Sequence, residues 1–327
     1  WRQTLGVERG WMGDDLYGSL IERFVRLVVV TDPEGFRALR GRSTLFLGNH
    51  EVQIESLLVT AIASYLIDGI VVTMANAKHA KGWVGWLVDR MFSYPGSADP
   101  ENIVYFDQSD PAQMFTLIED FKRDVRARGA SVMVHAPGTR AVRAGQQVER
   151  VSSALLDMAM ELEMPIVPVH FSGGLPAEGV QAGKLEFPYE QGQQDYVFGA
   201  PLWPEDLLKM PYAERRDAVL DAINALGPVP QEARPLPGRP ELAAEIDVLH
   251  KDMGAGAVEA TLFHLLATWR HAGADTAQLL EGARSSALEV EDDERGQWLA
   301  EFAKRIFGPR GPRVQVKADG HTQDDLW

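Results

Sequence analysis

The chain has 327 residues, of which 45% are hydrophobic and 24% are charged, values typical of a globular protein long enough to bury its own core. It contains no Cys, which excludes disulfide scaffolds, Cys-ligated metal sites and thiol nucleophiles. Its formal net charge of −15 works against nucleic acid as a partner and against broad adsorption on anionic lipid.

Predicted helices and short apolar strands alternate over the first two thirds of the chain. Helical patterns lie at 14–29, in the segment that ends at 66, at 111–128 and at 151–163. Apolar runs predict strands at 44–48, 70–74, 103–106, 131–134, 165–169 and 196–199. This alternation predicts an α/β fold with a mostly parallel sheet flanked by helices, followed by a C-terminal helical appendage.

One apolar segment, 56–75, is long enough to be mistaken for a membrane span, since it carries a single charge, at Asp68. Asp68 and Gly69 divide it into a helix-compatible part and a β-branched part at 70–74. We therefore predict a buried helix followed by a buried strand.

A Pro-rich segment divides the chain, and the part after this segment is acidic. We predict a first domain over 1–227, a linker over 228–239, an acidic helical appendage over 240–308 and a mobile tail over 309–327. Helical patterns in the appendage lie at 240–271, 274–287 and 291–307. Residues 231–300 contain 13 Asp and Glu against 6 Lys and Arg, and we assign this part a solvated structural role.

His50 follows the strand at 44–48, and Glu55 lies five residues further on. If a helix begins near residue 51, the Glu55 carboxylate can fold back to the imidazole. A carboxylate that accepts one ring N–H fixes the tautomer and raises the basicity of the other nitrogen. The pair could then take a proton from an alcohol; the alternative is a structural histidine.

Gly138, Thr139 and Arg140 form a second polar turn, after the strand at 131–134. Loop N–H groups, a hydroxyl and a guanidinium suit a phosphate or carboxylate. Residues 122–150 contain 7 Lys and Arg against 2 Asp and Glu, a positive region in a negative chain. The alternative is that the basic residues at 122–128 form the solvated face of a helix.

Four segments resemble, in order, the motifs of the glycerolipid acyltransferases, which include glycerol-3-phosphate and lysophosphatidic acid acyltransferases. Residues 45–55 (LFLGNHEVQIE) resemble the NHx4D motif, and residues 136–141 (APGTRA) are similar to the motif FPEGTRS. Residues 164–169 (MPIVPV) resemble the fourth motif, and residues 196–202 resemble the strand that comes after it. The resemblance covers 14–225 and leaves the C-terminal helices unexplained.

The resemblance implies an O-acyltransferase of lipid metabolism and phospholipid biosynthesis, with no cofactor. His50 would be the base, Glu55 would orient it, and Gly138, Thr139 and Arg140 would bind the acceptor. The acyl group would come from acyl-CoA or an acyl carrier protein. It would go to the hydroxyl of a lysophospholipid such as lysophosphatidic acid, or of glycerol 3-phosphate.

The chain departs from the family pattern in several places. Glu55 replaces the usual Asp, and Gln108 stands where the second motif has a phosphate-binding Arg. In the third motif, His135, Ala136 and Pro137 replace the usual Phe, Pro and Glu. We expect His135 not to be catalytic. Candidates for the missing positive charge are Arg143, Arg90, Lys78 and Lys81.

Two other functions stay open: an offloading acyltransferase or thioester hydrolase with a non-phosphate acceptor, and a non-catalytic acyl-binding module. Gln108 and Pro137 favour the first alternative, whereas an intact His50 with an acid at 55 argues against the second. No metal site is predicted, because the histidines are scattered along the sequence.

The expected location is cytoplasmic, with at most peripheral membrane contact. The chain begins at Trp1 with no signal-peptide pattern, which we interpret as a piece of a longer polypeptide. Similar domains occur inside polyketide and polyunsaturated fatty acid synthases, and this chain fits an excised domain of that kind. A cluster of Trp83, Trp86, Met91 and Phe92 could form an interfacial platform or an acyl-chain wall.

Overall fold

The computed structural model describes residues 11–83, 85–87, 103–107, 110–175, 186–188, 192–227, 240–318 and 321–324. These residues form two compact units, each assembled from separate stretches of the chain. The first unit contains the described residues of 24–84 and 101–239, and the second contains those before 24, 85–87 and those from 240 onward. The predicted linker at 228–239 lies outside the described residues, so the division of the chain at this linker stays a prediction.

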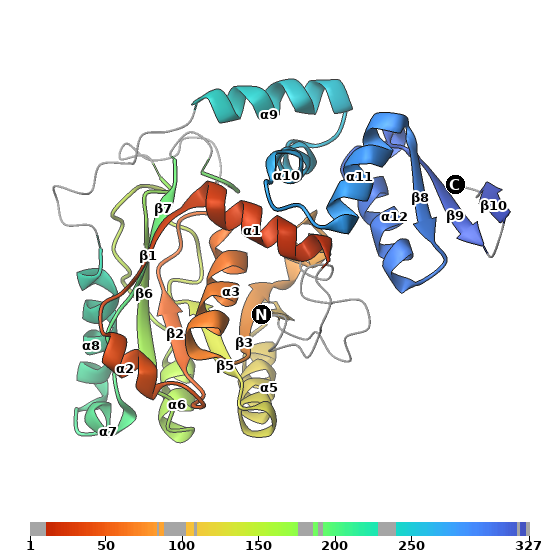
Figure 1. Ribbon diagram of the computed structural model, residues 1–327. Coiled ribbons are helices and arrows are strands. Elements are labelled where there is room, and N and C mark those ends of the chain that lie inside the picture. The colour runs from red at the N-terminus through yellow and green to blue at the C-terminus, as the bar shows by residue number, and fades with distance from the viewer. Residues whose placement is uncertain are drawn as a thin grey trace. The chain divides into compact units, whose positions relative to one another are not determined.

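The first unit is built on a seven-stranded sheet with the order β1-β7-β6-β2-β5-β3-β4 (Figure 1). Every neighbouring pair is parallel except β6 and β7. The prediction of an α/β fold with a mostly parallel sheet is therefore confirmed. The strands are β1 (Val25–Val30), β2 (Leu45–Gly48), β3 (Val71–Asn76), β4 (Ile103–Phe106), β5 (Ser131–His135), β6 (Ile166–Ser172) and β7 (Gln194–Phe198).

Helices connect and cover these strands, and their ends follow local sequence signals. Asp110 accepts a hydrogen bond from the Ala112 N–H at the start of α5, and Gly129 ends that helix with a φ of 62°. The helices of this unit are α2 (Pro33–Ala38), α3 (Glu55–Ile67), the 3₁₀ turn η1 (Ala77–His79), α5 (Pro111–Arg128), α6 (Ser153–Glu161), α7 (Pro204–Leu207) and α8 (Tyr212–Ala225).

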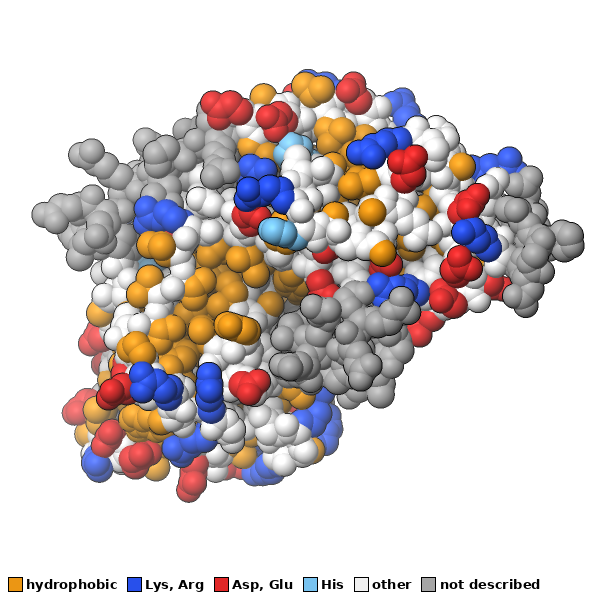
Figure 2. All heavy atoms as spheres, viewed as in Figure 1, with side chains coloured by type: hydrophobic (Ala, Val, Ile, Leu, Met, Phe, Trp, Pro, Cys, Tyr) orange, Lys and Arg blue, Asp and Glu red, His pale blue; other side chains and the backbone are white. Residues whose placement is uncertain are grey.

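The apolar segment at 56–75 forms a buried helix and a buried strand, as predicted. Asp68 adopts a left-handed conformation (φ 54°), which ends α3 before β3 begins. Hydrophobic side chains gather over α3 on the face shown in Figure 2, and Tyr65 of this helix is 78% exposed. Among the described residues, no helix combines the length and the hydropathy needed to cross a membrane.

The position of β2 at the centre of the sheet determines where the polar loops meet. Leu45 and Leu47 of β2 share one buried cluster with Val132 and Val134 of β5 and with side chains of α5, α6 and α8. The register pairs Gly48 with His135 at the ends of these two parallel strands. The loops that follow β2 and β5 therefore leave the sheet side by side, at its carboxyl edge.

The second unit contains four helices after residue 240 and also a three-stranded sheet that sequence patterns did not predict. Residues 313–318 of the predicted mobile tail form a strand parallel to β8, so the prediction of a mobile tail was wrong for these residues. The elements are α1 (Met12–Phe24), α9 (Pro240–Met253), α10 (Ala257–Thr268), α11 (Ala274–Ser285), β8 (Ala287–Glu291), α12 (Glu294–Phe307), the 3₁₀ turn η2 (Gly308–Arg310), β9 (Arg313–Ala318) and β10 (His321–Asp324).

Helix α1 belongs to this second unit, and one of its side chains binds groups that lie far along the sequence. The Asp15 carboxylate accepts hydrogen bonds from the Gly273 N–H (2.7 Å) and the Thr276 hydroxyl (2.5 Å). These groups lie at the start of α11, where the first backbone N–H groups of a helix need an acceptor. Asp15 lies in the first turn of α1, and its hydrogen bonds stabilise the start of α11, more than 250 residues further along the chain.

His170 of β6 gives the first unit a measurable sensitivity to acid. The side chain is 4% exposed, and burial lowers its pKa to about 4. An unfolded chain takes up this proton near pH 6.5, so the stability contributed by neutral His170 is complete above pH 6.5 and is lost as the pH falls toward 4.

We expect this residue to cost the protein about 2.5 kcal/mol of unfolding free energy between pH 7 and pH 4.5. Urea unfolding at both pH values measures the unfolding free energy of the parent and of His170→Gln. Between pH 7 and pH 4.5, the variant should lose about 2.5 kcal/mol less than the parent loses. The matched control is His271→Gln, because His271 is exposed. Equal losses in the parent and both variants would contradict the assignment.

Candidate active site

The site is built on the loop between β2 and α3, which is anchored by Asn49. The Asn49 side chain donates to the Phe171 carbonyl (2.8 Å) and accepts from the Phe171 N–H (2.7 Å), so it bridges two neighbouring strands. The Ala141 N–H donates to the His50 carbonyl at 2.7 Å. These contacts hold the loop that carries His50 against β6 and against the loop after β5.

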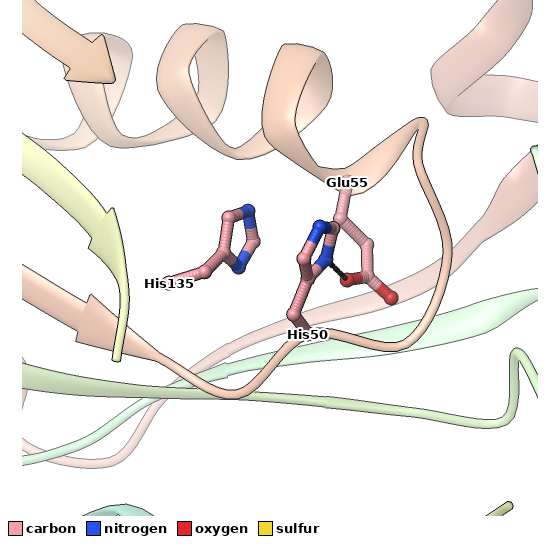
Figure 3. Close-up of side chains that lie close together, drawn as sticks. All are labelled: His50, Glu55 and His135. Carbon is pink, nitrogen blue, oxygen red and sulfur yellow. Dashed lines mark hydrogen bonds and ion pairs between the residues drawn. The ribbon is translucent and has the colours of Figure 1, made fainter. Parts of the chain in front are cut away.

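His50 and Glu55 form the pair that the sequence predicted. His50 Nδ1 lies 3.0 Å from Glu55 Oε2, and the Glu55 side chain is fully buried (Figure 3). A carboxylate can only accept, so Nδ1 carries the hydrogen and Nε2 keeps its lone pair. His50 is 11% exposed and lines a cavity, so this lone pair belongs to a base that a substrate could reach.

Glu55 is held by three further donors at the start of α3. Its oxygens accept from the backbone N–H groups of Glu51 (2.9 Å) and Val52 (3.0 Å) and from Gln194 Nε2 (2.6 Å). Burial raises the pKa of Glu55, and the hydrogen bonds from Gln194 and the two N–H groups offset part of this rise. These donors favour the charged form of the carboxyl group.

Glu51 is a second buried acid that sequence reasoning missed. It is 3% exposed, and its Oε2 accepts from the Gly174 N–H at 3.0 Å. Burial raises its pKa well above the usual value, and the Glu55 charge raises it further. Two adjacent buried acids do not ionise together easily, so we place the negative charge on Glu55 and the proton on Glu51.

His135, at the end of β5, stacks on His50. The ring centroids are 3.8 Å apart and the planes differ by 17°. Figure 3 shows the His50 ring between the His135 ring and the Glu55 side chain. Burial, and then the neighbouring His50, lower the pKa of His135 to about 3, so this ring is neutral at physiological pH.

A cavity of about 290 Å³ opens beside the two histidines, within the first unit. Its lining combines apolar side chains from α3, β3, β4, β5 and α6 with polar and cationic side chains. The apolar group includes Leu57, Met74, Ile103, Phe106, Val134 and Leu155, and the polar group includes Gln53, Lys78, His79, Thr139 and Arg140.

The structure brings the three predicted acceptor-binding residues, Gly138, Thr139 and Arg140, to this cavity with His50. Arg140 is 12% exposed, and both terminal nitrogens lie near one oxygen of Glu186, at 3.3 and 3.4 Å. Glu186 also accepts from the Trp83 indole at 3.2 Å. Sequence reasoning missed this acid because nothing near residue 186 marks it as a partner of a loop 46 residues earlier.

The other predicted cations are distributed unevenly. Lys78 lines the cavity, whereas Arg143 is exposed and lies outside the described lining. Arg90 and Gln108 lie outside the described residues. His79, another residue of the lining, has a pKa lowered by burial and then by Lys78 and Arg140. The cavity lining therefore includes cationic side chains in a chain of net charge −15.

The predicted aromatic cluster divides between the two units. Trp83 stacks on Phe187 with ring centroids 5.4 Å apart, in the first unit. Trp86 packs against Phe302 at 5.2 Å, in the second. Met91 and Phe92 lie outside the described residues. A single platform of these four side chains therefore stays a prediction.

His50, Glu55 and His135 also form a group whose ligand-type atoms all lie within 4.8 Å of one another. An imidazole binds a metal ion through a lone pair in the plane of its ring. Because the two rings are stacked nearly parallel, their lone pairs do not converge on one point. The arrangement does not fit a metal centre, and we derive no step through one.

Comparison with known proteins adds a likeness of fold. No family model matches the chain, and no curated protein matches it in sequence. The chain is similar to the crystal structure of a 1-acyl-sn-glycerophosphate acyltransferase, PlsC, from Thermotoga maritima. The two share 18% identity over 65% of this chain and 76% of the other, with a TM-score of 0.40. At these values the likeness carries no inference about activity.

Proposed function

We propose that the protein is an O-acyltransferase that moves a fatty acyl group from a thioester to a hydroxyl. The observation that carries the proposal is the His50–Glu55 pair, 3.0 Å apart, beside a cavity lined by both apolar and cationic side chains. The resemblance of residues 45–55 and 136–141 to two acyltransferase motifs agrees with this chemistry. No cofactor is needed for such a transfer.

In the proposed reaction, His50 Nε2 takes the proton of the acceptor hydroxyl as its oxygen attacks the thioester carbonyl carbon. A C–O bond forms and gives a tetrahedral oxyanion. The C–S bond then breaks, and the departing thiolate takes the proton from His50. Glu55 stabilises the imidazolium during these steps, because its carboxylate accepts the Nδ1 hydrogen of His50.

The apolar and the cationic side chains of the cavity lining suggest the two substrates. Leu57, Phe106 and Leu155 offer an apolar wall to an acyl chain, and Lys78 and Arg140 offer positive charge to an anion. The proposed acceptor is a lysophospholipid such as lysophosphatidic acid, or glycerol 3-phosphate. The proposed donor is acyl-CoA or an acyl carrier protein, the latter if the chain is a domain of a larger synthase.

A second candidate is transfer to an uncharged alcohol or to water. It is favoured by the pairing of Arg140 with Glu186, because a carboxylate at the guanidinium reduces the positive charge available to a phosphate.

An acceptor screen tests both candidates. One acyl thioester is supplied, first as the CoA ester and then on a carrier protein, and free thiol and acyl product are measured. The acceptors compared are lysophosphatidic acid, glycerol 3-phosphate, an uncharged long-chain alcohol and water. We expect fastest transfer to an anionic acceptor; fastest transfer to the alcohol or to water would establish the second candidate, and no transfer to any would contradict both.

We predict different effects on kcat for the same substitution at the two buried acids. Glu55→Gln should lower kcat about 10²-fold or more with a smaller change in the donor KM, because the amide no longer stabilises the protonated ring. Glu55→Asp should retain appreciable activity, since it keeps the carboxylate.

Glu51→Gln is the matched control, because glutamine has the shape of a protonated glutamic acid and Glu51 is also buried. We expect its kcat to stay within about threefold of the parent. Steady-state kinetics of the three variants decide the matter. A Glu55→Gln enzyme as active as Glu51→Gln would reduce Glu55 to a residue that only begins α3.

A further inference from the structure

The His135 ring lies flat against the proposed base, and its own hydrogen bonds determine its protonation. His135 Nδ1 lies 2.6 Å from the Asn49 carbonyl oxygen, and Nε2 lies 3.0 Å from the Ser56 hydroxyl. The carbonyl can only accept, so Nδ1 carries the hydrogen. Nε2 of the neutral ring is then an acceptor, and the Ser56 hydroxyl donates to it.

These contacts connect His135 to both ends of the loop that carries His50. Asn49 precedes His50 directly, and Ser56 follows Glu55 in the first turn of α3. A ring held at both nitrogens cannot rotate, so its face is a fixed surface for the His50 ring, 3.8 Å away. At its edge, the His50 ring is held through Nδ1 by the Glu55 carboxylate.

We propose that His135 is a positioning residue that holds the His50 ring in the orientation required to take a proton, a role that rests on the proposed function. Two imidazolium rings in contact would repel each other, so a partner that stays neutral allows His50 to become charged. The ionisable groups around His135 are His50, Glu55 and, beyond Glu55, Glu51. His135 thus supplies a flat, uncharged surface and takes no part in proton transfer.

The same contacts could describe a nucleophile and its base, with Ser56 attacked into an acyl-enzyme and His135 as the proton acceptor. The structure favours positioning. In a nucleophile–base arrangement, a carboxylate usually accepts from the second ring nitrogen and stabilises the imidazolium. In His135 that nitrogen instead donates to the Asn49 backbone carbonyl, which carries no charge. Burial also keeps the ring from accepting protons, as the low pKa of His135 indicates.

Kinetics of three variants separate these roles. His135→Ala removes the stacked surface and is expected to lower kcat by about 10- to 100-fold, with both KM values within about threefold. His135→Phe restores a ring and should recover most of the loss, with pH–rate limbs at the parent's positions. Ser56→Ala should stay within about tenfold of the parent. Loss of activity in Ser56→Ala as severe as in a His50 variant, or loss of a pH–rate limb in His135→Phe, would overturn the proposal.

Nitrogen-15 NMR of the histidine rings tests the same idea without any substrate. In the parent, His50 and His135 should both show a single tautomer with hydrogen on Nδ1. In folded His135→Ala, the unsupported His50 ring can turn away from the Glu55 carboxylate that fixes its tautomer, so the His50 signals should move toward the average of two tautomers. In His135→Phe they should stay at the parent values. An unchanged His50 spectrum in His135→Ala would overturn the positioning role. Because the NMR measurement needs no turnover, it still tests how the His50 ring is held if the acyltransferase proposal fails.

Discussion

His50→Ala is expected to lower acyl transfer by about 10²–10⁴-fold, the usual contribution of a general base. The reason is geometric: His50 Nε2 carries the lone pair at the cavity, because Nδ1 donates to a fully buried carboxylate at 3.0 Å. The loss should appear mainly in kcat, since an imidazole that removes a proton acts in the transition state. Steady-state rates with a CoA thioester and the best acceptor give the measurement.

The control for this variant is His79→Ala, because His79 also lines the cavity but has no role in the proposed proton transfer. We expect His79→Ala to stay within about tenfold of the parent. Circular dichroism and urea unfolding verify that both variants fold. Turnover near the parent's in a folded His50→Ala protein would defeat the mechanism.

Arg140→Ala is expected to raise the KM of an anionic acceptor by about 10- to 150-fold, with little change in the donor KM. A charge-assisted contact contributes about 1.5–3 kcal/mol, and 1.4 kcal/mol corresponds to one factor of ten. Arg140→Lys should recover only part of the loss, because an ammonium group cannot make the paired contact of a guanidinium. Each substrate is varied in turn at a saturating level of the other.

Glu186→Gln completes this experiment. Glu186 holds the Arg140 guanidinium at 3.3 and 3.4 Å in the free protein, so an anionic acceptor has to share or displace it. Removing the negative charge should lower the acceptor KM, opposite to the effect of Arg140→Ala. Arg143→Ala is the matched control, because Arg143 is exposed and outside the described lining of the cavity.

Other outcomes would reassign Arg140. A selective rise in the donor KM would place it at the phosphates of CoA or of phosphopantetheine. An effect on neither substrate would make it a structural residue of the loop and would remove the main support for a phosphate-bearing acceptor. A rise in the acceptor KM for Glu186→Gln would show that the acid orients Arg140 for substrate.

The sequence by itself determined the features that depend on near neighbours along the chain. Apolar runs located β2, β5 and β6, and Asp68 with Gly69 separated a buried helix from a buried strand. The His50–Glu55 contact was also predictable, because five residues across a helix start bring two side chains within reach. Each of these features follows from the short-range geometry of the backbone.

Tertiary structure alone decided the partners of those residues. Gln194 donates to Glu55 across 139 positions, His135 stacks on His50 from a strand 85 positions later, and Glu186 reaches Arg140 from 46 positions away. The strand order puts β7 antiparallel beside β6, and the pairing of β8 with β9 turns a predicted tail into a sheet. Side-chain patterns report whether a residue is buried, but which distant residue it meets depends on strand order and register, which only the packing of the whole chain determines.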